Sequence, residues 1–144
     1  MDIVMELVPK HKKQNKFLQL FKKSSSNKQL PMTHTFSEHK DQIQVLQVQS
    51  LLSEYDNKSI MLEVENRIDK GWNKFVIDLS LMDIMNSVGL NFLIFMMKKS
   101  QNSGGNFAVA NASENIIKLL EVTKLKSFFQ LSPSVDEAMK NLER

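Results

Sequence analysis

The chain of 144 residues carries a net charge of +3, has no cysteine and contains only three histidines. A chain of this length suits one domain with one core, and the lack of cysteine excludes disulfides, thiol catalysis and cysteine-based metal sites. The histidines show neither metal-ligand nor catalytic-triad spacing, so we expect no metal, no cofactor and no histidine-based catalysis.

The positive charge is confined to the start of the chain. Residues 1–31 contain seven lysines and two acidic residues, a net charge of +5, which leaves −2 for residues 32–144. We predict that residues 1–31 form a basic, flexible extension, in which residues 16–23 could touch anionic surfaces weakly, and that residues 32–144 form the folded domain. Direct nucleic-acid binding is not expected, because the domain itself is not basic.

No stretch of the sequence is typical of a membrane span or a signal peptide. The longest strongly apolar run, residues 92–97, is far shorter than the roughly 20 residues that a spanning helix needs. Residues 1–6 are acidic, whereas a signal peptide begins with basic residues. We therefore expect a cytoplasmic protein.

Two strands open the predicted domain. Residues 33–37 and 42–48 alternate between polar and apolar side chains, as expected of an antiparallel hairpin. An amphipathic helix is predicted over residues 57–70, and Gly71 supplies its natural end. Residues 75–77 are a short run of branched and aromatic residues, typical of a strand buried on both faces.

Helices and strands continue to alternate to the end of the chain. The predicted order is a helix over 88–100, a break at Gly104–Gly105, a strand over 107–110, a helix capped by Ser113, a short strand over 128–131 and a last helix that begins at the capping box 134–137. Such alternation implies parallel pairing through right-handed crossovers. We predict an α/β fold, a single domain with a mixed, mostly parallel sheet, an antiparallel opening strand and about four helices.

The helix over residues 88–100 carries more apolar residues than one face requires. Its predicted core face contains Leu90, Leu93, Ile94 and Met97, which recur at helical spacing. On this assignment Phe92 and Phe95 project toward solvent, and exposed aromatic pairs commonly mark interfaces. We predict that they bind a partner protein; the alternative is that the last helix or the extension covers them.

The junction between strand 75–77 and this helix is the candidate functional site. Ser87 lies where the helix begins, and unpaired N–H groups and the helix dipole favour an anion there, so a phosphate on Ser87 would be stabilised. Serine at such a position is also a common N-cap. Asp78 is expected to be a hydrogen-bonded carboxylate at the strand end, and Gly89 to serve backbone geometry or close packing.

The segments 78–80 (Asp-Leu-Ser) and 86–90 (Asn-Ser-Val-Gly-Leu) resemble motifs of the STAS domain family, in its anti-sigma-factor-antagonist branch. The likeness covers roughly residues 32–144 and includes residues 117–129. It implies that Ser87 is the phosphoacceptor and that Asp78, Asn86 and Gly89 shape the acceptor loop. Two positions depart from the family: Asn86 replaces an Asp, and Lys124 replaces a Gly that often ends the third helix.

The resemblance implies that the protein acts by partner switching. The unmodified protein would bind an anti-sigma factor that is also a Ser/Thr kinase, phosphorylation of Ser87 would end binding, and a phosphatase would restore it. The protein itself is not expected to be an enzyme, because only Asp78 and Asp83 lie near the site and no Gly-rich phosphate loop is present. The alternative is a constitutive STAS subunit of a transporter-associated or sensory assembly, without a phosphorylation switch.

Overall fold

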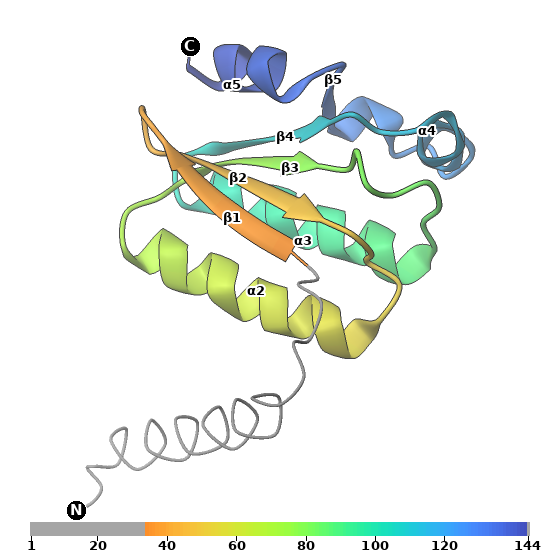
Figure 1. Ribbon diagram of the computed structural model, residues 1–144, viewed down its shortest axis with the longest axis horizontal. Helices are drawn as coiled ribbons and strands as arrows, with labels where there is room; N and C mark the ends of the chain where they lie inside the picture. The colour runs from red at the N-terminus through yellow and green to blue at the C-terminus, as the bar shows by residue number, and fades with distance from the viewer. Residues whose placement is uncertain (1–33, 144) are drawn as a thin grey trace, which may run out of the picture. The chain divides into compact units, whose positions relative to one another are not determined.

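The computed structural model describes residues 34–143, which form a sheet covered by helices (Figure 1). The strands are β1 His34–His39, β2 Ile43–Val48, β3 Lys74–Asp78, β4 Asn106–Ala110 and β5 Gln130–Ser132. The helices are α2 Glu54–Asp69, α3 Ser87–Asn102, α4 Glu114–Val122 and α5 Val135–Glu143, with a 3-10 turn η1 at Lys126–Phe128. Within these residues, no helix is both long and apolar enough to cross a bilayer.

The strands lie side by side in chain order, from β1 to β5. β1 pairs with β2 in antiparallel fashion, with His34 opposite Val48, while the pairs β2–β3, β3–β4 and β4–β5 are parallel. The carboxyl ends of β2, β3, β4 and β5 therefore meet at one edge of the sheet. This arrangement confirms the predicted mixed sheet with an antiparallel opening strand and four helices.

The sheet is buried on both faces, which explains the apolar sequence of β3. Alternate strand residues point to opposite sides. Phe75 and Ile77 contribute to the larger cluster, on the face that α2 and α3 cover, whereas Val76 packs in a second cluster with Ala138 and Leu142 of α5 (Figure 1). α2 and α3 also pack against each other.

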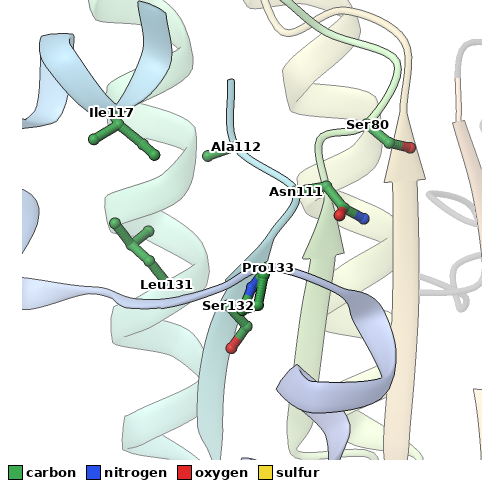
Figure 2. A pocket seen from close by; sticks show the side chains of 7 residues that line it. All are labelled: Ser80, Asn111, Ala112, Ile117, Leu131, Ser132 and Pro133. Carbon is green, nitrogen blue, oxygen red and sulfur yellow. The ribbon is translucent and has the colours of Figure 1, made fainter. Parts of the chain in front are cut away.

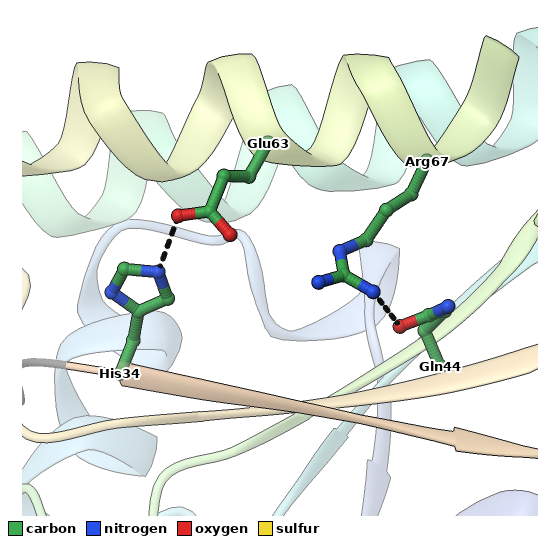
Figure 3. Close-up of polar contacts among 4 residues, drawn as sticks. All are labelled: His34, Gln44, Glu63 and Arg67. Carbon is green, nitrogen blue, oxygen red and sulfur yellow. Dashed lines mark hydrogen bonds and ion pairs between the residues drawn. The ribbon is translucent and has the colours of Figure 1, made fainter. Parts of the chain in front are cut away.

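Polar contacts hold the edge strand β1 and its neighbour β2 to α2 (Figure 3). His34 Nε2 lies 2.8 Å from Glu63 Oε2, and the guanidinium of Arg67 donates to Gln44 Oε1 at 2.9 Å. The same guanidinium lies 3.9 Å above the ring of Phe36. Gln44 is fully buried, so its hydrogen bond to Arg67 offsets part of the cost of placing an amide in the core.

Most predicted boundaries are correct to within three residues, and local chemistry explains the differences. α2 begins at Glu54 because Ser53 accepts a hydrogen bond from the N–H of Asp56. The predicted caps at Ser113 and Ser134 are confirmed by hydrogen bonds from the N–H groups of Ile116 and Glu137, respectively. The predicted extension, residues 1–31, lies outside the described residues.

The ends of α2 and α4 are followed by residues with positive φ. Gly71, with φ of 106°, follows α2 as predicted, because glycine has no Cβ to oppose this conformation. After α4 the left-handed residue is Lys124, with φ of 62°. Lys124 therefore adopts a conformation that favours glycine, at a steric cost of about 1–2 kcal/mol.

The predicted core face of α3 is confirmed at Leu90 and Leu93, but the buried face is rotated from the predicted one at the other positions. The buried residues are Gly89, Leu90, Phe92, Leu93, Met96 and Ser100, whereas Ile94 and Met97 are only half-buried. Phe92 has 0% of its surface exposed, so it does not face solvent, and Phe95 is half-buried. The reason is that α3 contacts both the sheet and α2, which turns Phe92 inward, and six consecutive apolar residues carry no period that could fix this rotation.

Candidate functional site

The loop of residues 79–86 joins β3 to α3 and is called the β3–α3 loop below. It begins at the carboxyl edge of the parallel strands, which is the edge where α/β sheets usually bind ligands. Within residues 34–143, no three histidine or acidic side chains gather in a group that could hold a metal ion.

Asp78 ends β3 and anchors the start of the loop. Its Oδ1 accepts hydrogen bonds from the backbone N–H of Ser80 and from Asn111 Nδ2, both at 3.0 Å, and its Oδ2 accepts one from Gln47 Nε2 at 3.0 Å. Burial by itself raises the pKa of Asp78, but the hydrogen bonds from Asn111, Ser80 and Gln47 outweigh it and lower the pKa below its ordinary value. Asp78 is thus a satisfied carboxylate that orders the ends of β2, β3 and β4.

Asn86 caps α3 at the other end of the loop. Its Oδ1 accepts from the N–H of Val88 at 3.0 Å and of Gly89 at 3.2 Å. Ser87 is therefore the first helical residue and not the cap. It is exposed, and its hydroxyl makes no hydrogen bond to any other described residue.

Gly89 allows the end of the loop to approach α3 closely. A Cβ at this position would lie 2.5 Å from Met85 Cγ and 3.4 Å from Leu51 Cβ. The residue lies inside a regular helix, so its role is close packing and not an unusual backbone conformation. The contacts are made with the loop and with the segment before α2.

The middle of the loop has a buried side and an exposed side. Met82 is 6% exposed and lies in the core, and its N–H donates to the carbonyl of Leu79 at 3.0 Å. Leu81 and Ile84 project outward with 53% and 60% of their surface exposed. The loop that leads to the exposed Ser87 thus carries two large, exposed aliphatic side chains.

An open pocket of about 600 Å³ lies where β3, β4 and β5 end (Figure 2). Its lining comprises Ser80, Asn111, Ala112, Ile117, Leu131, Ser132 and Pro133. Figure 2 shows Ser80 and Asn111 at one end and the apolar Ile117 and Leu131 at the other. Among the described residues, the lining is made of polar, uncharged and apolar side chains.

The structure separates the predicted site residues into three groups. Asp78 lies at the start of the loop, Asn86, Ser87 and Gly89 lie at its end, and Phe92 lies in the core, with Phe95 half-buried beside it at a ring distance of 6.3 Å. No hydrogen bond connects Asp78 with Asn86 or Ser87 among residues 34–143.

Sequence reasoning missed the partners that hold the loop. Gln47 and Asn111 bind Asp78, and Ser113 and Asn115 bind Asp83. The sequence contains a pattern that could have identified Gln47 and Asn111. Both lie at or just after the ends of strands next to β3, and parallel strands place such residues at one edge of the sheet, close to Asp78.

The profile of the STAS domain matches residues 37–138 of this chain. A Thermotoga maritima protein, provisionally named an anti-sigma factor antagonist, is 29% identical over 77 residues, which are 54% of this chain and 68% of that protein. The solved structure of the anti-sigma factor antagonist SpoIIAA in its unphosphorylated form has a TM-score of 0.65 at 15% identity, covering 75% of this chain and 94% of that one. An anti-sigma factor antagonist from Mycobacterium paratuberculosis has a TM-score of 0.66 at 23% identity, covering 78% and 94% of the two chains. The profile spans well over half of the sequence and the fold agrees with it, and the chain therefore belongs to the STAS domain family.

Proposed function

We propose that this protein is an anti-sigma factor antagonist that acts by partner switching, with Ser87 as its phosphoacceptor. The unmodified protein binds an anti-sigma factor with Ser/Thr kinase activity in the cytoplasm, phosphorylation of Ser87 releases it, and a phosphatase reverses the change. The protein is then a ligand and a substrate, and its partner supplies the catalysis. Relatives that carry the name of anti-sigma factor antagonist support this role.

The observation that carries the proposal is that Asn86, and not Ser87, caps α3. Because Asn86 provides the helix cap, the Ser87 hydroxyl is exposed and is not needed by the helix. A kinase can modify this hydroxyl without removing a capping bond. Structures of SpoIIAA have been solved in an unphosphorylated and in a phosphorylated form, so the family fold accommodates both states in that protein.

The charge around Ser87 favours a phosphate within the domain. The first turn of α3 contains no acidic residue, and its N-terminus carries partial positive charge. A phosphoryl group adds about −1.5 to −2 of charge at pH 7. The same group would oppose docking of a partner on this surface, because its charge and volume would have to be accommodated in a closely packed interface.

The docking surface that we propose consists of Ser87 and the two exposed aliphatic side chains of the loop, Leu81 and Ile84. The sequence predicts that Phe92 binds the partner. Phe92 is buried and cannot contact a partner without unfolding of α3, so it is not part of this surface. Phe95 lies about two turns along α3 from Ser87 and is half-buried, so we retain it only as a contact at the rim.

Capture of partners from a native lysate tests the proposed switch at Ser87. The full chain is the bait, and the masses of the intact bait and of the captured proteins are measured. We expect capture of a kinase-like partner and a phosphate-sized mass increase on the bait that is absent from Ser87→Ala. Ser87→Glu should weaken capture, and Ser59→Ala, at another exposed serine, should behave as wild type. Capture of a membrane transporter with no mass increase, unchanged by Ser87→Ala or Ser87→Glu, would instead support the constitutive subunit.

A second pair of variants tests the apolar part of the surface. Leu81→Ser and Ile84→Ser should each weaken capture while the melting temperature stays within a few degrees, because both side chains are already exposed. Val122→Ser is the control, since Val122 is 75% exposed on α4. Normal capture by the Leu81→Ser, Ile84→Ser double variant would remove this loop from the interface.

A further inference from the structure

The middle of the β3–α3 loop is bound to the start of α4, about 30 residues further along the chain. The hydroxyl of Ser113 donates to the carbonyl oxygen of Asp83 at 2.9 Å, and Asn115 Nδ2 donates to Asp83 Oδ2 at 3.3 Å. These two hydrogen bonds are called the Asp83–α4 contact below. They join the loop to a helix whose Ile116 and Leu120 are buried in the larger core cluster.

Helix capping alone does not account for this contact. As the N-cap of α4, Ser113 needs only to accept the N–H of Ile116, which it does at 3.2 Å, yet its hydroxyl proton points to the loop. Asn115 is exposed and lies inside the helix, where it caps nothing, and its side chain bonds only to Asp83 among residues 34–143. Both donors therefore serve the loop.

The loop needs a restraint at this point. Hydrogen bonds to Asp78 fix the start of the loop, and the Asn86 cap fixes its end. The central residues take part in neither set of hydrogen bonds. Met82 supplies apolar burial there, while Leu81 and Ile84 on the exposed side keep more than half of their surface in solvent. Exposed apolar side chains on an untethered loop would sample many conformations, and ordering them on binding costs conformational entropy.

We infer that Ser113 and Asn115 are positioning residues, which hold Asp83 so that the β3–α3 loop presents Leu81, Ile84 and Ser87 as one preformed surface. This inference rests on the proposed function for its consequence, which is tighter partner binding through preorganisation. The contact itself is a property of the isolated protein. The two parts can therefore be tested separately.

Hydrogen exchange on the full chain tests the contact. Ser113→Asp keeps an excellent N-cap, but it removes the hydroxyl donor and places a second carboxylate beside Asp83. Ser113→Thr keeps both the cap and the donor and is its matched control. We expect the amides of residues 80–86 to exchange about three- to tenfold faster in Ser113→Asp and in Asn115→Ala, the range expected for loss of one hydrogen bond. Ser113→Thr and the exposed α4 variant Lys118→Ala should match wild type.

Partner affinity tests the consequence, with the kinase-like protein identified by capture on wild type. Ser113→Asp and Asn115→Ala should weaken binding by about three- to tenfold at an unchanged melting temperature, and Ser113→Thr should bind as tightly as wild type. Unchanged exchange in both variants overturns the contact. Faster exchange with unchanged affinity overturns the positioning role. If wild type binds no anti-sigma partner, the proposed function fails, while the exchange data still decide whether the contact orders the loop.

Discussion

The assignment of Asn86 as the cap of α3 makes a prediction about two adjacent residues. Asn86→Ala removes an acceptor of two backbone hydrogen bonds, at 3.0 and 3.2 Å. Loss of an N-cap costs about 0.5–2 kcal/mol, typically about 1. Ser87→Ala removes a hydroxyl that has no hydrogen-bond partner among residues 34–143 from the first helical position, and alanine is the better helix former by up to about 0.5 kcal/mol. The two variants should therefore differ although they are neighbours.

The assay is thermal unfolding of the full chain followed by circular dichroism. Asn86→Ala should lower the melting temperature by roughly 3–6 °C, since about 1 kcal/mol shifts a domain of this size by that amount. Ser87→Ala should leave it unchanged or slightly raised, and Asn86→Asp should match wild type because aspartate caps equally well. A loss of stability in Ser87→Ala equal to that in Asn86→Ala would refute the assignment.

Four further predictions follow from particular residues. Phe92→Ala should cost about 3–5 kcal/mol in denaturant unfolding, whereas an exposed residue would cost under about 0.5. Gly105→Ala should cost about 3 kcal/mol or more by the same measurement, because its Cβ would overlap the backbone carbonyl of Asn73. Lys124→Gly should raise the free energy of unfolding by up to about 1 kcal/mol, since it relieves a left-handed φ of 62°. The lowered pKa of Asp78 stabilises the fold above the unfolded-state pKa of about 4, and this stabilisation is lost as the pH falls through the folded-state value. Urea midpoints at about pH 6 and pH 3 should thus differ less in Asp78→Asn than in wild type.

The sequence was most informative where structure depends on neighbouring residues. The run Phe75–Ile77 indicated a strand buried on both faces, and the structure places β3 in the middle of the sheet. Ser113 and Ser134 were recognised as caps because capping involves residues only three positions apart. The parallel order of the later strands followed from the alternation of strands and helices, since the crossover geometry leaves few choices.

Features that depend on distant segments were not predicted. The rotation of α3 is decided by its simultaneous contact with the sheet and with α2, and the apolar run 92–97 fits several rotations equally well. The N-cap alternative for Ser87 is wrong, because the cap is Asn86; asparagine and serine both cap well, and only the backbone conformation chooses between them. The partners of Asp78 and Asp83 come from segments 29 to 33 residues away, so their roles required the strand register and the docking of α4.

The neutral cap at Asn86 separates two effects that an aspartate would combine. A carboxylate at this position could assist the kinase reaction, yet it would also place a negative charge beside the phosphate that the reaction creates. Asparagine keeps both capping hydrogen bonds and carries no charge. A phosphate on Ser87 would therefore meet less electrostatic repulsion at the start of α3 than it would beside an aspartate. On the proposed function, we expect Asn86→Asp to raise the rate at which the cognate kinase phosphorylates Ser87, and to lower the melting temperature of the phosphorylated protein relative to that of phosphorylated wild type. An unchanged phosphorylation rate in Asn86→Asp would show that the neutral cap does not slow the reaction.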